Sequence, residues 1–113
     1  GAAPRAAPAA SPAASPDDGA AARRTLDSLQ SALDPGSATA ADGRAAAGAL
    51  RALLPRLRTT RDSTWAYIRL VDAHLLTGDQ ARACSALRTA QSAARTADQR
   101  EAVRRYDEEL GCQ

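Results

Sequence analysis

Apolar side chains recur along the chain with the three-to-four-residue period of an amphipathic α-helix, in about five segments separated by proline, glycine or polar residues. The segment from Ser63 to about Thr77 is apolar around most of its circumference, which is typical of a helix packed between other helices. No segment shows the strict alternation of a half-buried strand. The pattern therefore predicts an all-α domain over residues 16–113 with this third helix at its centre.

The ends of the first two helices carry their own signals. Ser15 is placed to cap the first helix, Pro16 suits its first position, and Asp34-Pro35-Gly36 ends it. Thr39, followed three residues later by an acid, predicts the start of the second helix. Pro55 should end or kink that helix, because proline removes one backbone hydrogen bond and clashes with the preceding turn.

Tight corners should join the remaining helices. Asp62 or Ser63 is expected to cap the third helix. Gly78 should close it and Asp79 should cap the fourth, so this Gly-Asp pair predicts a helix–helix corner and not a phosphate loop. Thr96, with a glutamine three residues on, predicts a capping box for the fifth helix, whose apolar stripe includes Tyr106.

Residues 1–15 form a separate region of alanine, serine and regularly spaced proline. Such a segment lacks core-forming side chains and should be extended, partly as polyproline II. An extended proline-rich chain loses little conformational entropy on binding, so we expect this arm to lie across a partner protein. The residues expected to make that contact are Pro4, Arg5, Pro8 and Pro12.

Composition narrows the possible functions. The chain has no Phe or Met, one Trp and two Tyr, so large core residues are scarce and a small domain of this kind should need additional stabilisation. All basic residues are arginine, a bias typical of a GC-rich bacterial genome, and the net charge is only +2. The absence of lysine excludes a Walker-type phosphate loop and Schiff-base catalysis within this sequence. No run of large apolar residues is long enough to predict a transmembrane segment.

The two cysteines, Cys84 and Cys112, predict one disulfide. The fourth and fifth helices should be antiparallel neighbours, which brings the start of one to the end of the other. The bond would close a loop of roughly 28 residues and contribute on the order of 3–4 kcal/mol. Disulfides persist in oxidising compartments, so the pair favours an extracytoplasmic, periplasmic location; two buried thiols in a cytosolic protein are the alternative.

Catalytic and metal-binding constellations are not evident. His74 and Cys84 together provide too few ligands for a structural zinc site. His74 is expected to be a hydrogen-bonded residue in a seam between helices, and an enzyme that uses it as a base is a minor alternative. We therefore expect no enzyme activity, no catalytic residue, no metal, no cofactor and no small-molecule substrate.

Residues 63–95 resemble a tetratricopeptide repeat, a helical hairpin that stacks into an α-solenoid. The resemblance implies a short solenoid of about five helices. In this family the first helix of each pair lines a groove for partner peptides, although Trp65 and Ile68 could instead bury against the second helix. The matching motif positions are Tyr67, Leu70, Ala73, Gly78, Asp79, Ala83, Leu87 and Ala90. The implied groove residues are Trp65, Ile68, Arg69, Asp72 and Leu76.

These features together predict a non-catalytic protein–protein interaction module. We expect it to act as an accessory or scaffold subunit of a larger bacterial complex, peripheral to a membrane, such as a respiratory, photosynthetic or secretion complex. The expected partners are protein subunits, and no nucleic acid is expected. The alternative is a small arginine-rich helical protein that binds nucleic acid, which would show a steep loss of affinity with salt.

Overall fold

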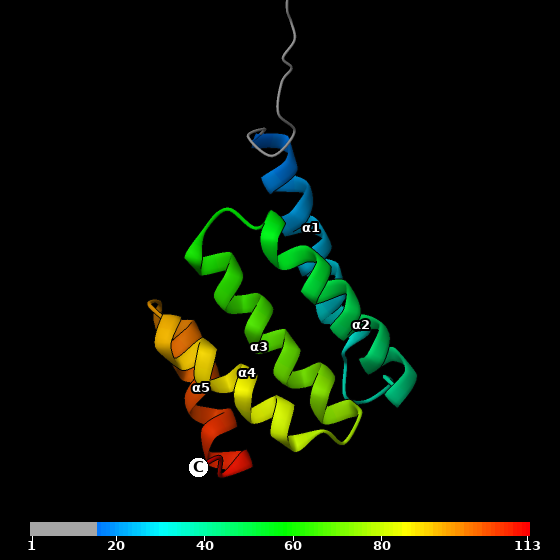
Figure 1. Cartoon of the computed structure of the whole chain (residues 1–113), viewed down its shortest axis with the longest axis vertical. Coiled ribbons are helices and arrows are strands. Elements are labelled where there is room, and N and C mark those ends of the chain that lie inside the picture. Colours follow the sequence, from blue (N-terminus) through cyan, green and yellow to red (C-terminus); the bar gives the residue numbers. More distant parts are fainter. Residues whose placement is uncertain (1–15) are drawn as a thin grey trace, which may run out of the picture.

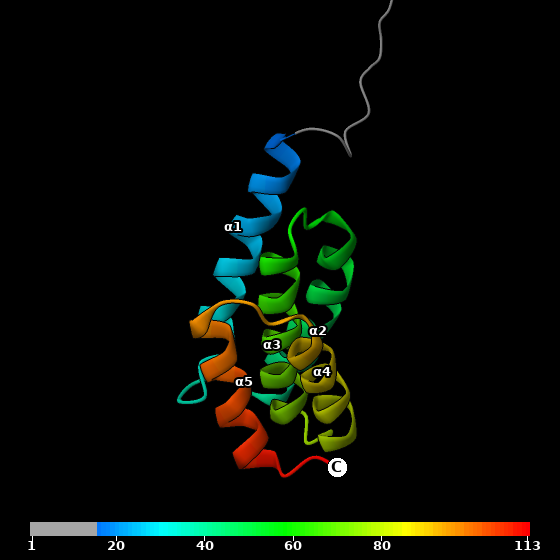
Figure 2. The same ribbon diagram turned by 90° about the vertical axis from the view of Figure 1, so that its left-hand side faces the viewer.

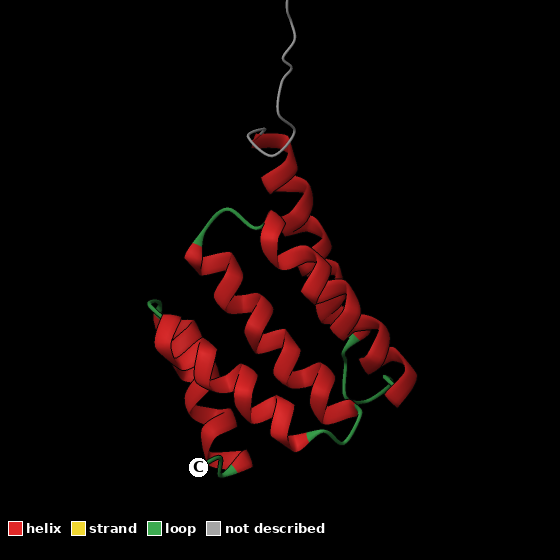
Figure 3. Cartoon of the chain, viewed as in Figure 1, coloured by secondary structure: helices red, strands yellow, loops and turns green. Residues whose placement is uncertain are grey.

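The computed structural model describes residues 16–113, and the regular structure in this part of the chain is entirely helical (Figures 1 and 3). The predicted cap Ser15 and the arm residues Pro4, Arg5, Pro8 and Pro12 lie outside the described residues. The all-α prediction is confirmed. The elements are α1 (Pro16–Ala32), α2 (Ala40–Leu53), the 3₁₀ helix η3 (Leu54–Arg56), α3 (Thr60–Leu76), α4 (Gln80–Ala93) and α5 (Ala97–Leu110).

Three helices form a layer, and two more pack on one side of it. Helices α2, α3 and α4 lie side by side, with α3 in the middle (Figure 1). Helix α1 packs against α2 and helix α5 packs against α4, both on the same side of the layer (Figure 2). Helix α3 therefore has two open flanks, one between α1 and α5 and the other between α2 and α4.

Helix α3 is the centre of the core, as its nearly continuous apolar surface predicts. Ile68, Val71 and Ala73 are completely buried. Alanines on α4, including Ala83 and Ala90, are also completely buried and let neighbouring helices approach closely. No large hydrophobic side chain is exposed among residues 19–113. The few large apolar residues are thus buried in the core or packed against it.

Most of the predicted helix ends are confirmed. Thr39 and Asp42 form the full capping box, with each side chain accepting from the other residue's backbone N–H. The α-helix before Pro55 ends at Leu53 and tightens into the 3₁₀ turn. At the corner after α3, Gly78 has a φ of 75°, and Asp79 accepts a hydrogen bond from the Arg82 N–H.

The start of α3 differs from the prediction. Thr59, and not Asp62 or Ser63, is the cap: its hydroxyl accepts a hydrogen bond from the Asp62 N–H, and the helix begins at Thr60. The Asp62 carboxylate accepts instead from Arg23 of α1 at 3.3 Å. A contact with a distant helix therefore fixes the role of this acid.

The capping box predicted for α5 is only half formed. Thr96 accepts from the Gln99 N–H, as predicted. The Gln99 side chain does not return to Thr96: it is completely buried, donates to the Arg61 carbonyl at 2.8 Å and accepts from the Arg95 N–H. Gln99 therefore links the beginning of α5 to the beginning of α3.

Helices α2 and α3 approach closely at Gly43. A methyl group at this position would lie 2.7 Å from the carbonyl oxygen of Ala73 and 2.8 Å from the Leu76 Cβ. Both distances are shorter than van der Waals contact. The close packing of α2 on α3 therefore requires the absence of a side chain here.

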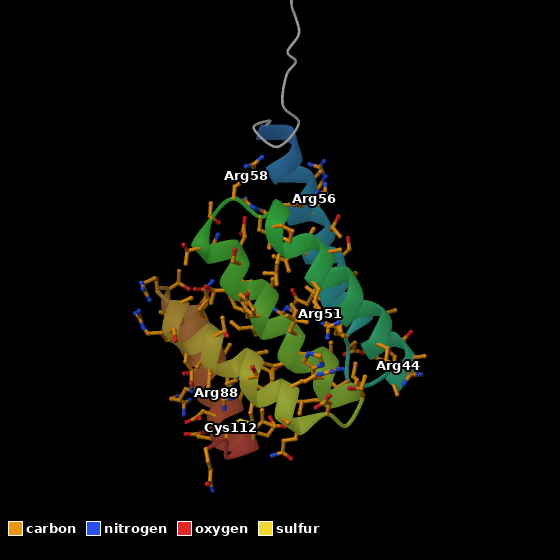
Figure 4. All side chains as sticks on the ribbon, in the orientation of Figure 1. Arg44, Arg51, Arg56, Arg58, Arg88 and Cys112 are labelled. Atoms are coloured by element: carbon orange, nitrogen blue, oxygen red, sulfur yellow. A yellow bond between two sulfur atoms is a disulfide. The ribbon has the colours of Figure 1, made fainter. Side chains whose placement is uncertain are left out.

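The disulfide between Cys84 and Cys112 is present, as predicted, with 5.6 Å between the two Cα atoms. It joins α4 to the residues that follow α5 (Figure 4). Gln80 supports the same junction, because its side chain donates to the Leu110 carbonyl at 3.1 Å. The contacts hold the end of α5 against the beginning of α4.

Candidate partner-binding groove

A groove runs between α1 and α5 on one flank of α3. It consists of two adjoining hollows of about 360 and 620 Å³, which share Asp27, Gln30 and Arg69 in their walls. Helix α1 forms one wall, α3 the floor and α5 the opposite wall, and Figure 2 shows α1 and α5 on this side of the layer. We call this feature the α1–α5 groove and define it by Arg23, Asp27, Gln30, Trp65, Arg69, Asp72 and Tyr106.

A polar network occupies the floor of the α1–α5 groove. The Arg69 guanidinium donates to the Asp72 carboxylate at 3.2 Å and lies 5.3 Å from the ring centroid of Trp65. The other Asp72 oxygen accepts a hydrogen bond from the Tyr106 hydroxyl of α5. The side chains of Arg69 and Asp72 are only 18% and 19% exposed, so solvent screens this pair less than a surface ion pair. The network fixes the orientation of the indole, the guanidinium and the phenol.

Burial governs the protonation of this network. It raises the pKa of Asp72 above its usual value, and the Tyr106 hydrogen bond and the Arg69 charge oppose that rise. Burial also raises the pKa of Tyr106, and the Asp72 carboxylate raises it further. The phenol therefore remains a hydrogen-bond donor at neutral pH.

The predicted groove residues divide into two sets. Trp65, Arg69 and Asp72 line the α1–α5 groove. Ile68 does not, because it is completely buried in the core, in agreement with the alternative considered for it. Leu76 is half-buried beside Gly43 and lines neither hollow. Positions 65, 69 and 72 share one side of α3, whereas Ile68 turns toward the interior.

The sequence pattern did not identify the walls of the groove. Tyr106 was assigned to an apolar stripe, yet its hydroxyl belongs to the polar network. Asp27 and Gln30 are exposed residues of α1 that become groove residues because α1 packs against α3 on the side of the layer that also carries α5. Tyr106 itself is the one sequence feature that could have indicated this wall, because the hydroxyl of a half-buried tyrosine requires a hydrogen-bond partner.

His74 lies on the opposite flank of α3 and is only 7% exposed. The predicted hydrogen bond is not found among residues 19–113, where no side chain or backbone group is bonded to the imidazole. Its charged neighbours across the seam include Arg51 and Arg82, which have no acceptor to offer. His74 therefore lies in a seam between helices, as predicted, but its neighbours there are cationic side chains.

Two further observations concern the described part of the chain. Among residues 16–113, no three histidine, cysteine, aspartate or glutamate side chains are grouped so that they could hold a metal ion. No helix of this region has both the length and the hydrophobicity needed to cross a bilayer.

In comparisons with protein-family models, curated proteins and solved structures, no match to this chain was found. The resemblance to tetratricopeptide repeats therefore stays a prediction based on the motif residues.

Proposed function

We propose that this chain is a non-catalytic protein–protein interaction module whose α1–α5 groove binds a segment of a partner protein. One observation carries the proposal: the only tryptophan of the chain, a tyrosine and a partly buried arginine converge on the same groove. Trp, Tyr and Arg are the residue types that contribute most binding energy at protein interfaces. Here Trp65, Arg69 and Tyr106 are also fixed in place before any partner arrives, which lowers the entropic cost of binding.

The order of the helices supports a tetratricopeptide-like solenoid as the framework of this module. Helices α1 and α2 form one hairpin, α3 and α4 form the next, and α5 follows as a closing helix. The first helix of each hairpin contributes to the groove, together with α5. Side-by-side first helices are the arrangement by which repeat proteins build an extended binding surface.

The chemistry of the groove favours a partner segment that carries both charged and aromatic or aliphatic groups. The groove is lined by positive charges, on Arg23 and Arg69, and by negative charges, on Asp27 and Asp72. The exposed part of Trp65 offers an apolar surface between them. A mixed surface of this kind suits an accessory subunit that joins a larger complex through polar contacts around one aromatic anchor.

The host that we propose is a bacterial, membrane-associated complex outside the cytoplasm, such as a respiratory, photosynthetic or secretion complex. The disulfide supports an oxidising compartment such as the periplasm. We further propose that the arm of residues 1–15 binds the same complex, so that arm and groove act together as two linked contacts. Deletion of residues 1–15 should then weaken association while the far-UV circular dichroism of the helical body is retained.

A steric block tests the groove directly. Gln30 is exposed on α1 and borders both hollows, so Gln30→Trp should fill the groove without disturbing the core. Gln91 is exposed on α4 and lines neither hollow, so Gln91→Trp is a matched control. Each tagged variant is expressed in the source bacterium, and the proteins that copurify are quantified by mass spectrometry. We expect a defined set of proteins with the wild type and Gln91→Trp, and its loss with Gln30→Trp.

Two results would contradict the proposal. In the first, Gln30→Trp retains the same proteins at the same level as the control. In the second, no protein copurifies reproducibly with the wild type. Thermal melting of both variants separates loss of binding from loss of the fold.

The nucleic-acid alternative has less support on this flank of the molecule. Arg23 and Arg69 are paired with Asp62 and Asp72, so their charge is largely compensated. A nucleic-acid surface requires clustered excess positive charge.

A further inference from the structure

The opposite flank of α3 carries a second site with different chemistry. Two adjoining hollows of about 370 and 420 Å³ lie between α2 and α4, with Arg51, His74 and Arg82 in the walls of both. We call this feature the α2–α4 pocket. Its further polar lining residues are Arg44, Tyr67, Thr77, Asp79, Ser85 and Thr89.

Positive charge gathers in the α2–α4 pocket from two facing helices. Arg44 and Arg51 are two turns apart on α2, so they share one side of that helix, and Arg82 faces them from α4. Figure 4 shows Arg51 between the α2 and α3 ribbons and Arg44 near the start of α2. The only acid in the lining is Asp79, which already caps α4 and lies 3.5 Å from the Arg82 guanidinium.

The charges converge on His74. Burial lowers the pKa of this imidazole, and the nearby Arg51 and Arg82 lower it further, against the opposing effect of Asp79. Both guanidinium groups thus act on the same buried ring, which itself has no hydrogen-bond partner among the described residues. Unlike the arginines of the groove, Arg44 and Arg51 form no ion pair within residues 19–113.

We propose that the α2–α4 pocket binds a small ligand through its oxyanion, either a phosphate monoester or a dicarboxylate. Guanidinium groups hold both kinds of oxyanion through paired, charge-assisted hydrogen bonds. The Ser85 hydroxyl on α4 and the His74 imidazole on α3 supply further donors, whereas the Thr89 hydroxyl already donates to the Ser85 carbonyl.

The dimensions favour a small molecule over a macromolecule. A hollow of about 370 Å³, bordered by α2, α3 and α4 and open to solvent, has a volume within the range of small-molecule sites. Ser85 places one hydroxyl on the α4 wall, near the guanidinium of Arg82, which suits a compact charged group. A nucleic acid would need a continuous basic stripe along the surface, so its binding is an outcome that the test must separate.

The test is a ¹⁵N-edited NMR titration of the full chain at constant ionic strength. One series uses methyl phosphate, one uses succinate, and one uses a short DNA duplex. We expect shift changes centred on Arg51, His74 and Ser85 with methyl phosphate or succinate, and the tighter of the two identifies the source of the oxyanion. The absence of such changes at millimolar concentrations of both would overturn the proposal, as would binding of DNA alone.

A pair of charge-matched variants separates a site from general charge attraction. Arg51→Gln removes one guanidinium from the pocket, and Arg105→Gln removes one from an exposed position of α5 outside it. We expect Arg51→Gln to raise the dissociation constant roughly tenfold or more, because one charge-assisted contact is lost. Arg105→Gln should change it by less than about twofold. Equal weakening by both variants would show nonspecific attraction and contradict the site.

The imidazole gives an independent readout. An anion held against His74 should raise its pKa, so binding should tighten as the pH falls through that value. The groups facing the ring are Arg51 from α2, Tyr67 from α3, Asp79 at the corner and Arg82 from α4. Sulfate is the probe for this measurement, since its charge stays constant over the pH range in which the imidazole titrates. A His74 titration curve that sulfate leaves unchanged would contradict the proposed contact.

Discussion

The two flanks of α3 differ in how their charges are satisfied. On the α1–α5 groove side, Arg69, Asp72 and Tyr106 complete one another, and Arg23 pairs with Asp62. On the α2–α4 pocket side, Arg44 and Arg51 form no ion pair within residues 19–113, although they belong to the same small domain. Internally satisfied groups form a rigid surface that a partner can recognise by shape, whereas exposed cations without an internal acid are available to bind an external anion.

One helix serves both flanks because its residues alternate between them. Trp65, Arg69 and Asp72 face the groove, and Tyr67, Leu70 and His74 face the pocket. The two walls are secured by different means. Helix α5 is held by the disulfide, and α2 is held by the close approach at Gly43. Variants at these points should therefore affect the two flanks separately.

The largest effect should come from the disulfide. Reduction, or Cys84→Ser with Cys112→Ser, should lower the free energy of unfolding by about 3–4 kcal/mol, because the unfolded chain regains the entropy of a long loop. Urea unfolding measures this loss. Hydrogen exchange should accelerate in α5, the wall of the groove, before it does in α2. Uniform acceleration in both helices would show that the two walls are not independent.

The next effect concerns α2 and uses two glycines of the same helix. Gly43→Ala should destabilise the fold by about 1–3 kcal/mol, because a methyl group would collide with the Ala73 carbonyl. Gly48 has no atom within 4 Å of an added methyl group, so Gly48→Ala should stabilise the helix by about 0.5–1 kcal/mol. Thermal unfolding of both variants should give shifts of opposite sign. Equal shifts would mean that α2 does not depend on the close contact.

The corner between α3 and α4 should tolerate few substitutions of Gly78. Gly78 has a φ of 75°, and a β-branched residue is strained there, so Gly78→Val should cost about 1–2 kcal/mol. Gly78→Asn is the control, since asparagine adopts this conformation more readily. Chemical unfolding should rank the wild type first, Asn second and Val last. An unchanged stability for Val would contradict the strain expected at the corner.

The smallest effect concerns the polar network in the groove. The raised pKa of Asp72 means that the folded protein holds this proton to a higher pH than the unfolded chain does. Its contribution to stability is therefore greatest in acid and is lost as the pH rises from 3.8 through the folded-state pKa. Tyr106→Phe removes a hydrogen bond that lowers this pKa, so the value should rise further, with a loss of about 0.5–1.5 kcal/mol at neutral pH.

Carboxyl ¹³C NMR of Asp72 in the wild type and in Tyr106→Phe measures the shift. Tyr67→Phe is the matched control, because Tyr67 lies on the other flank, away from Asp72. A lower Asp72 pKa in Tyr106→Phe, or an equal change in the control, would contradict the assigned network.

The sequence was sufficient to predict the structural features that depend on residues close together in the chain. Helix periods, the box at Thr39, the corner at Gly78 and the pairing of Cys84 with Cys112 all follow from neighbouring residues and chain direction. The capping roles expected of Asp62 and Gln99 were wrong, because Arg23 and Arg61 approach from elsewhere in the chain. Tertiary contacts override local hydrogen-bonding preferences in such cases.

The candidate site was only partly predictable for the same reason. The period of α3 indicated Trp65, Arg69 and Asp72, but it could not separate them from Ile68 and Leu76, which turn toward the core and α2. The walls depend on where α1 and α5 pack relative to α3, and neither helix carries a sequence signal for that placement. The α2–α4 pocket was missed because its arginines are far apart in sequence and look like ordinary surface charges.

The most direct test of the central claim is site-specific photocrosslinking in living source cells. A photoreactive amino acid is placed at Gln30 in the α1–α5 groove or at Gln91 on the outer side of α4. If the groove binds a partner segment, position 30 should give a discrete crosslinked protein band that position 91 does not. The band should weaken when residues 1–15 are deleted. The same products at both positions, or none at position 30, would contradict the account.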